Sequence, residues 1–565
     1  MPNRLADPRF SALLFWIVLA GWIAFLRAPS YTDAFFDPDV AATVYSAQLF
    51  AHGSCIYPDA VETKPPGSYA VLALLLAVFR NMVGVHLAMV LYHLAVAAVL
   101  ARFVTRRGGV IAGRFAALAY GSYSALGFVN GYAPNFETWT LLPISAAAMF
   151  LSEEAESPAA WRVLVVGVLA GTAVLMKQQA AIVAAALGLA VLVLPRPAAE
   201  RRARPVALAL FAAGALVPWA ITLAYFAGKS CAGDLVAALS PARNATYVAS
   251  NHPGEILARA GRFFGTFVRH SWFLVAVAVA GSARALREAK EKPLLLVAGL
   301  WLAGAVAATW AGTMFFPHYA LFLVPPLAVL AGAGMGAAVG VARERLVRIA
   351  IALVVAGLLA ANLHREIRLA TVAARDLLRS GRVESRELFQ VNASYGPSWI
   401  DFVVGISNLD FETCARTAGK FIRAHSTPSD PILVYDYVPS VYWYARRRAP
   451  TRHHMNFDVA RELPEDYGRW FTVENDRLRR NRAELMRDLA ARPPRFIVRA
   501  RRDRPAVPDS ETNPLNVYGD HMNYALWRAP LFPALQEFVE RHYRPATGAP
   551  DIPLSILERD DATFP

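Results

Sequence analysis

The sequence predicts a polytopic α-helical membrane protein with a C-terminal α/β domain. Of its 565 residues, 56% are hydrophobic and 18% are charged, and the mean hydropathy is +0.34. This composition is too apolar for a soluble protein of that length. The long apolar runs stop near Asn362, and charged, aromatic and turn residues alternate after that point. We therefore expect a membrane domain at residues 1–362 and an α/β domain at residues 363–565, an ordinary domain size.

Apolar runs of sufficient length predict the helices of the membrane domain. We interpret the first run as an uncleaved span, because no small-x-small cleavage site follows it. The run at 68–79 has only about 12 residues, short of the ~20 that a spanning helix needs, so we expect it to lie in the interface or to re-enter. The eleven expected spans are residues 11–27, 85–101, 114–129, 138–151, 162–176, 179–194, 206–227, 271–284, 294–311, 319–341 and 346–362.

Basic residues are concentrated in alternate loops, and this pattern predicts the orientation. By the positive-inside rule these loops face the cytoplasm, which places the N-terminus inside and the C-terminal domain outside. The exterior loops are then 28–84, 130–137, 228–270 and 312–318. The basic clusters are Arg102, Arg106, Arg107 and Arg114; Arg196, Arg201, Arg202 and Arg204; Arg284, Arg287, Lys290 and Lys292; and Arg343, Arg345 and Arg348.

Seven ionisable residues fall at the exterior ends of the expected spans. Charged groups at membrane depth are costly and tend to mark functional sites. Each could alternatively be an interfacial charge whose head reaches the lipid head groups. The gathering of several on one face favours a site, and an acid beside a cation suits chemistry on a lipid-borne phosphate. These residues are Asp37, Asp39, Lys64, Arg80, Glu137, Lys177 and His318.

Four motifs in order carry a family resemblance. The first, Asp39 followed by Lys64-Pro65-Pro66-Gly67-Ser68-Tyr69, resembles the first exterior loop of polytopic glycosyltransferases with the GT-C fold, above all the protein O-mannosyltransferase and aminoarabinose (lipid A) transferase group. The resemblance covers residues 1–362. The other three motifs are Asn135-Phe136-Glu137, Lys177-Gln178-Gln179, and Pro317-His318-Tyr319 with Pro325-Pro326.

The resemblance implies an enzyme that moves a sugar from a polyprenyl-phosphate carrier to an extracytoplasmic lipid, protein or cell-envelope glycan, with inversion. Asp39 would then be the general base, because a carboxylate can take the proton of an acceptor hydroxyl. Lys64 would neutralise the donor phosphate as a point charge. Arg80, Lys177 and His318 are further candidates for the phosphate, and Glu137 and Tyr319 for positioning the acceptor or the sugar.

The sequence departs from the family pattern after Asp39. Many relatives have Asp-Glu at this step, whereas Asp39 is followed by Val40. Asp37 would share the catalytic role or would cap the following helix. We expect Asp39 to be the base, because its spacing to Gly53 fits the family better.

We expect no cofactor, no metal and no nucleic acid. No His, Cys or Asp cluster has metal-ligand spacing, and the family works mostly without a catalytic metal. The net charge of +14 comes mainly from the cytoplasmic loops, which would lie against anionic head groups of the bilayer. Of the three cysteines, Cys55, Cys231 and Cys414, a Cys55–Cys231 bridge is one alternative, but we expect three unpaired thiols.

The C-terminal domain is expected to hold a small mixed or parallel sheet. Its role would be to cover the active site or to hold the acceptor. The alternatives are a transporter or flippase of lipid-linked sugars, disfavoured because no internal repeat is visible, and a non-catalytic envelope-assembly protein. The Ala- and Arg-rich composition suggests the inner membrane of a bacterium. The expected elements are helices at 411–425, 438–444 and 477–491 and strands at 432–435 and 495–498.

Overall fold

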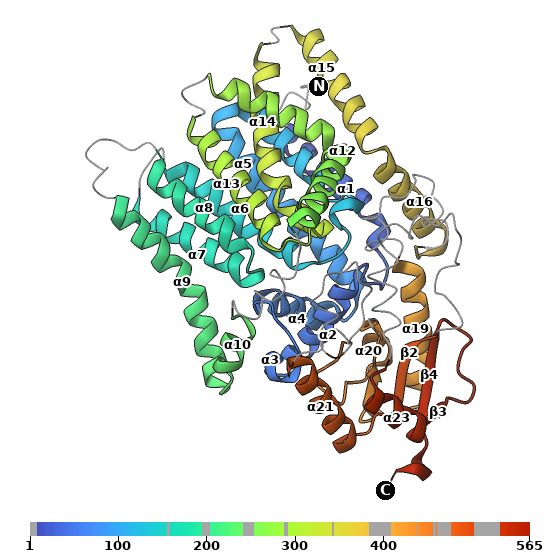
Figure 1. Cartoon of the computed structure of the whole chain (residues 1–565). Coiled ribbons are helices and arrows are strands. Elements are labelled where there is room, and N and C mark those ends of the chain that lie inside the picture. Colours follow the sequence, from blue (N-terminus) through green and yellow to red (C-terminus); the bar gives the residue numbers. More distant parts are fainter. Residues whose placement is uncertain are drawn as a thin grey trace.

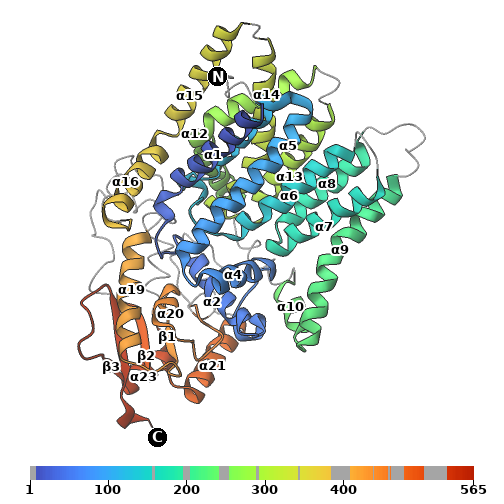
Figure 2. The same cartoon turned by 180° about the vertical axis from the view of Figure 1, so that it is seen from behind.

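The structure is a computed structural model in which a helical bundle and a smaller α/β domain lie at opposite ends (Figures 1 and 2). Helices of the N-terminal loop lie between these two parts in both views. The structure describes residues 8–154, 159–194, 204–240, 253–287, 292–341, 344–383, 408–436, 438–455, 459, 476–501 and 531–564.

The bundle consists of long apolar helices whose small residues allow close approach. Gly167 and Gly171 of α7 lie against the backbone of α9 at Phe211 and Ala215, so a side chain at either glycine would meet that backbone. The helices are α1 (Pro8–Leu26), α5 (Met82–Tyr123), α6 (Phe136–Glu154), α7 (Ala160–Met176), α8 (Ala180–Val193), α9 (Arg204–Gly228), α12 (Pro253–Ala285), α13 (Lys292–Ala311), α14 (Val324–Val341) and α15 (Arg345–Asn362).

The number of spans stays a prediction. Within the described ranges, six helices are long and apolar enough to cross a membrane, or seven if α15 and α16 (His364–Ser380), bent by 75°, form one broken span. Two expected spans, 85–101 and 114–129, are the two arms of α5, which breaks at Gly109 (φ 82°). The run expected to stay in the interface is α4 (Gly67–Phe79), whose 13 residues are too few for a straight span.

The first loop folds into short helices between the bundle and the C-terminal domain. After α1 come η2 (Ala28–Ser30), α2 (Pro38–Ala51), α3 (Ile56–Asp59) and α4. A disulfide joins Cys55, at the start of α3, to Cys231, at the start of α10 (Ala232–Ala238). The expectation of three unpaired cysteines was therefore wrong for two of them, and Cys414 is not part of the disulfide.

The C-terminal domain holds a four-stranded mixed sheet in the order β1-β2-β4-β3. The strands are β1 (Ile432–Val434), β2 (Phe496–Ala500), β3 (Tyr543–Pro545) and β4 (Leu554–Arg559). β1 and β2 are parallel, with Ile432 opposite Phe496, and the other two pairs are antiparallel. The helices are α19 (Asn408–Ala424), α20 (Ser440–Ala445), α21 (Asp476–Ala491) and α23 (Pro533–His542). The predicted mixed sheet and its first two strands are confirmed; β3 and β4 were not predicted.

The C-terminal domain is hydrogen-bonded to the first loop. The carbonyl oxygen of Asp33 accepts from the Tyr444 hydroxyl at 2.5 Å and from Arg416 Nη2 at 2.8 Å. The Tyr45 hydroxyl, on α2, accepts from the Ala449 amide at 2.9 Å. These bonds hold α2 and the segment before it against α19 and α20.

Candidate active site

Asp37 caps the helix that carries Asp39. The Asp37 backbone is extended, helix α2 begins at Pro38, and the amide of Asp39 donates to Asp37 Oδ1 at 2.9 Å. A proline at the first helical position and an acidic N-cap are both favourable there. Phe36, just before, has a φ of 62°, which is rare for a bulky residue and tends to occur at functional sites. This backbone fixes the direction of both carboxylates.

Asp39 and Lys64 form a partly exposed pair of opposite charges. Lys64 Nζ lies 3.7 Å from Asp39 Oδ2, and the two side chains are 23% and 39% exposed. The ammonium also lies 4.5 Å from the centre of the Phe136 ring. The Tyr57 hydroxyl donates to the Lys64 carbonyl oxygen at 2.9 Å, which holds the backbone ahead of α4. The pair is both oriented and accessible.

Behind this pair, a buried group connects four separate elements. Lys177 Nζ, at the end of α7, lies 2.8 Å from Glu137 Oε1, in the first turn of α6. His318, in η6 (Pro317–Phe322), has Nε2 at 3.9 Å from Glu137 Oε1 and Nδ1 at 3.9 Å from Asp37 Oδ2. The Tyr319 ring lies 5.5 Å from Lys177 Nζ. The structure therefore brings together residues that lie up to about 280 positions apart.

Asp37 is more deeply buried than Asp39, and this burial changes its acidity. Burial raises the pKa of Asp37 from 3.8 to about 8, and the neighbouring Asp39 and Glu137 add to the rise while Lys64 opposes it. Asp37 is therefore mostly protonated at neutral pH. A protonated carboxyl is a poor base, which leaves the more exposed Asp39 as the accessible carboxylate.

Two polar residues of this region were missed from the sequence. Asn130, with a φ of 51°, donates from Nδ2 to Asp37 Oδ2 at 2.8 Å. Glu62 is buried and accepts from the Ser46 hydroxyl at 2.6 Å and from the Tyr69 hydroxyl. An Asn beside a glycine suggests a left-handed turn, but nothing in the sequence indicates that it faces Asp37. Glu62 lies two residues before Lys64, and that closeness was the one available signal.

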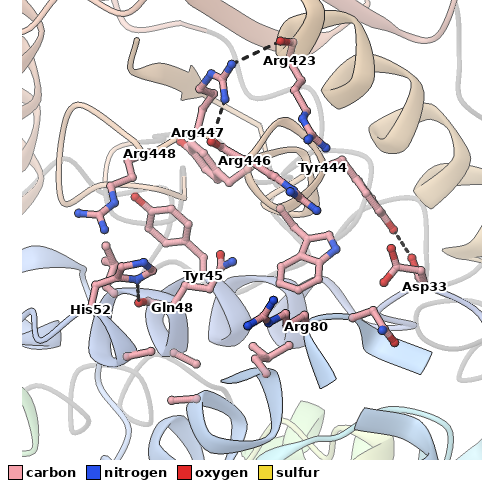
Figure 3. Close-up of a pocket in the computed structure, with 18 of the residues that line it drawn as sticks. Asp33, Tyr45, Gln48, His52, Arg80, Arg423, Tyr444, Arg446, Arg447 and Arg448 are labelled. Carbon is pink, nitrogen blue, oxygen red and sulfur yellow. Dashed lines mark hydrogen bonds between the residues drawn. The ribbon is translucent and has the colours of Figure 1, made fainter. Parts of the chain in front are cut away.

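Arg80 lies apart from the other predicted residues. It ends α4, whereas Lys64 precedes the start of that helix, so the helix of 13 residues separates them by about 20 Å. Arg80 lines a separate cavity of about 1010 Å³ between the first loop and the C-terminal domain (Figure 3). Within the ranges that the structure describes, no group of three or more His, Cys, Asp or Glu residues has the arrangement to hold a metal ion.

Comparison with solved structures defines the fold. The crystal structure of ArnT from Cupriavidus metallidurans bound to undecaprenyl phosphate aligns with 98% of this chain and 99% of its own, with a TM-score of 0.57 and 16% identity. The chain has the fold of the GT-C glycosyltransferases. The prediction of a GT-C membrane protein with a C-terminal α/β domain is thus confirmed.

Two further solved structures are similar to this chain over most of its length. The apo state of the same ArnT has a TM-score of 0.47 and 19% identity over 78% of this chain and 86% of its own. AglB, an archaeal oligosaccharyltransferase from Archaeoglobus fulgidus in complex with an inhibitory peptide and a dolichol-phosphate, has a TM-score of 0.48 and 11% identity over 99% of this chain and 75% of its own. No family model matches the chain, and no curated protein matches it.

Proposed function

We propose that the protein is an integral-membrane glycosyltransferase that moves a sugar from a polyprenyl-phosphate carrier to the hydroxyl of an extracytoplasmic acceptor. The observation that carries the proposal is the accessible Asp39–Lys64 pair, 3.7 Å apart, in front of the buried group of Asp37, Glu137, Lys177 and His318. The bound undecaprenyl phosphate of ArnT, which shares the fold over nearly the whole chain, supports a polyprenyl phosphate as the carrier.

In the proposed reaction, Asp39 acts as general base. The acceptor oxygen attacks the anomeric carbon of the donor sugar from the side opposite the phosphate, and its proton passes to the Asp39 carboxylate. The new carbon–oxygen bond forms as the bond between the anomeric carbon and the phosphate oxygen breaks. The polyprenyl phosphate leaves with the bonding electrons, so the configuration at the anomeric carbon is inverted.

The leaving phosphate needs charge stabilisation more than it needs a proton. Lys64 supplies a compact positive charge beside Asp39. Lys177 and His318 lie deeper and are held by Glu137. We therefore propose that they contribute to the positive potential around the leaving phosphate. Glu137 fixes that arrangement, and Tyr319 borders it. We leave Arg80 out of the donor site because it is about 20 Å from Lys64 along α4.

We propose that the site faces the periplasm of a bacterium, with the chain in the inner membrane and its N-terminus in the cytoplasm. Helix α1 begins at the end of the bundle opposite the C-terminal domain (Figures 1 and 2). Arg102 and Arg106 lie with Glu153 at the end of α6 remote from Glu137, as the positive-inside rule requires. The Cys55–Cys231 disulfide in the opposite loops suits an oxidising compartment.

The decisive experiment is Asp39→Asn in proteoliposomes supplied with a polyprenyl-phosphate sugar and a cell-envelope acceptor extract. We expect transfer to fall about 10²–10⁴-fold, the usual contribution of a general base. Asp59→Asn, an exposed carboxylate in the same loop, is the matched control and should retain the activity. Unchanged transfer by the Asp39 variant at normal protein level would contradict the assignment.

The donor and acceptor can be identified in cells. Mass spectrometry of envelope glycans from a strain without the protein should show one glycan that lacks a single sugar, with the lipid-linked donor accumulating. A flippase would instead leave every glycan that uses the donor incomplete. If the protein is a non-catalytic assembly protein, the Asp39→Asn variant would fully restore the envelope glycans of the deletion strain.

A further inference from the structure

A large cavity lies between α2 and α4 of the first loop and α19 and α20 of the C-terminal domain (Figure 3). Its volume is about 1010 Å³, at the upper end for a ligand pocket. Arg80 lines it from the end of α4, and Arg423, Arg446 and Arg448 line it from the C-terminal domain (Figure 3). It is thus a separate place from the group around Asp39 and Lys64.

The lining carries a large excess of positive charge. Seven of its side chains are Arg or Lys and one, Asp33, is a carboxylate. The Asp33 carboxylate accepts from the Met82 amide, so it is already engaged. Five of these seven cations are exposed, and their side chains make no hydrogen bond or ion pair with the residues that the structure describes. These are Arg80, Lys420, Arg423, Arg446 and Arg448. Like charges facing one cavity repel one another, and an anionic ligand would relieve that repulsion.

Two of these arginines occupy backbone positions that favour glycine. Arg80 ends α4 with a φ of 58°, and Arg446 ends α20 with a φ of 54°. Helices commonly end in this left-handed conformation, and glycine adopts it without steric cost. Both positions hold an arginine, and both arginines line the same cavity. Strained positions of this kind are typical of functional sites.

We propose that this cavity binds an anionic saccharide, that is, a glycan segment bearing several carboxylate or phosphate groups. Guanidinium groups bind both kinds of anion in bidentate fashion. The half-buried Trp443 and the side chains of Gln48 and His52 give the cavity apolar and hydrogen-bonding surface for sugar rings. The proposal concerns binding alone and does not depend on the transfer reaction.

The cavity and Asp39 share helix α2. Asp39 lies in its first turn, whereas Gln48 and His52 lie at its end, about 14–20 Å further along the axis. A saccharide of several residues that is held at Arg80 and Arg446 would therefore be long enough to reach from the cavity to Asp39. An anionic chain anchored here would be kept next to the first loop while its other end stays free.

The test measures binding of tetragalacturonate, a saccharide with four carboxylates, to the full-length protein in phosphatidylcholine nanodiscs by calorimetry, with no donor present. Neutral maltotetraose is the control ligand. We expect the first to bind and the second not to bind. Arg80→Gly and Arg446→Gly should each raise the Kd about tenfold, as expected for loss of a charged hydrogen bond. Both should keep or raise the Tm, because glycine relieves the left-handed backbone.

Ser230→Gly is the matched control, because Ser230 has a φ of 59° and does not line the cavity. It should leave the Kd unchanged. Absence of tetragalacturonate binding, or an unchanged Kd in both arginine variants, would overturn the proposal. Displacement of the saccharide by phosphatidylglycerol in the nanodisc would overturn it as well, because the cavity would then be a lipid head-group site. Equal binding of maltotetraose would show that charge plays no part.

Discussion

The raised pKa of Asp37 makes a sharp prediction about the substitution Asp37→Asn. An asparagine is nearly isosteric with the protonated carboxyl but does not ionise. Burial raises the pKa of Asp37 to about 8, above its ordinary value of 3.8. The folded protein therefore holds a proton that the unfolded chain releases. Its stabilising effect is fully present below about pH 4 and is lost as the pH rises to about 8.

The size of the stability change follows from the pH range between the ordinary and the raised pKa of Asp37. Each pH unit between the two pKa values lowers the free energy of unfolding of the wild type by about 1.4 kcal/mol. Between pH 5 and pH 8 the loss is about 4 kcal/mol, and the Asp37→Asn variant lacks it. The variant also alters the hydrogen bonds of residue 37 to the Asp39 amide and Asn130. That cost is independent of pH, so it cancels when the two pH values are compared.

The assay is unfolding of the purified protein in mixed micelles by titration with SDS, at pH 5 and at pH 8. We expect the free energy of unfolding of the variant to rise by about 4 kcal/mol relative to that of the wild type between pH 5 and pH 8. The variant and the wild type differ in their free energy of unfolding. If that difference changes by less than about 1 kcal/mol between pH 5 and pH 8, Asp37 is ionised in the folded protein and the reasoning fails. Ionised Asp37 would then be a rival to Asp39 as the base.

Two further predictions concern bonds that hold the first loop and the buried group. Lys177→Met should lower the free energy of unfolding by about 3–5 kcal/mol, because Glu137 keeps a buried charge without its 2.8 Å partner. In the double variant with Glu137→Gln, the free energy of unfolding should recover most of this loss in the same titration. If the effects of the two substitutions simply add, the Lys177–Glu137 pair is refuted. Replacing Cys55 and Cys231 with serine should cost about 2–5 kcal/mol. Maleimide labelling of the denatured, unreduced wild type should modify Cys414 alone, and labelling of three thiols would exclude the disulfide.

The fold and most of the candidate site could be predicted from chemistry that is local in the sequence. Apolar length marked α4 as too short for a straight span, although α8, expected as a span, has only 14 residues. Charges at helix ends marked Asp39, Lys64, Glu137, Lys177 and His318. Such charges are too costly at membrane depth unless they meet partners, so each one implied the others.

What the sequence did not predict depends on direction in space. Arg80 follows the same apolar run that Lys64 precedes, but α4 carries it to the other end of the helix. Asn130 contacts Asp37 only because both backbones turn sharply there. The Cys55–Cys231 pair joins residues 176 positions apart, and an odd number of cysteines does not say which two meet.

The bonds to the Asp33 carbonyl give the C-terminal domain a mechanical role. Tyr444 and Arg416 both hold this one oxygen, only four residues before Asp37. With so short a chain between, a rotation of the domain of a few degrees would shift the start of α2 and thus the two carboxylates. We infer that the domain holds the start of α2, and with it the proposed base Asp39, in position. Chimeras that exchange it between GT-C proteins would have to preserve these two bonds to keep the alignment of Asp39.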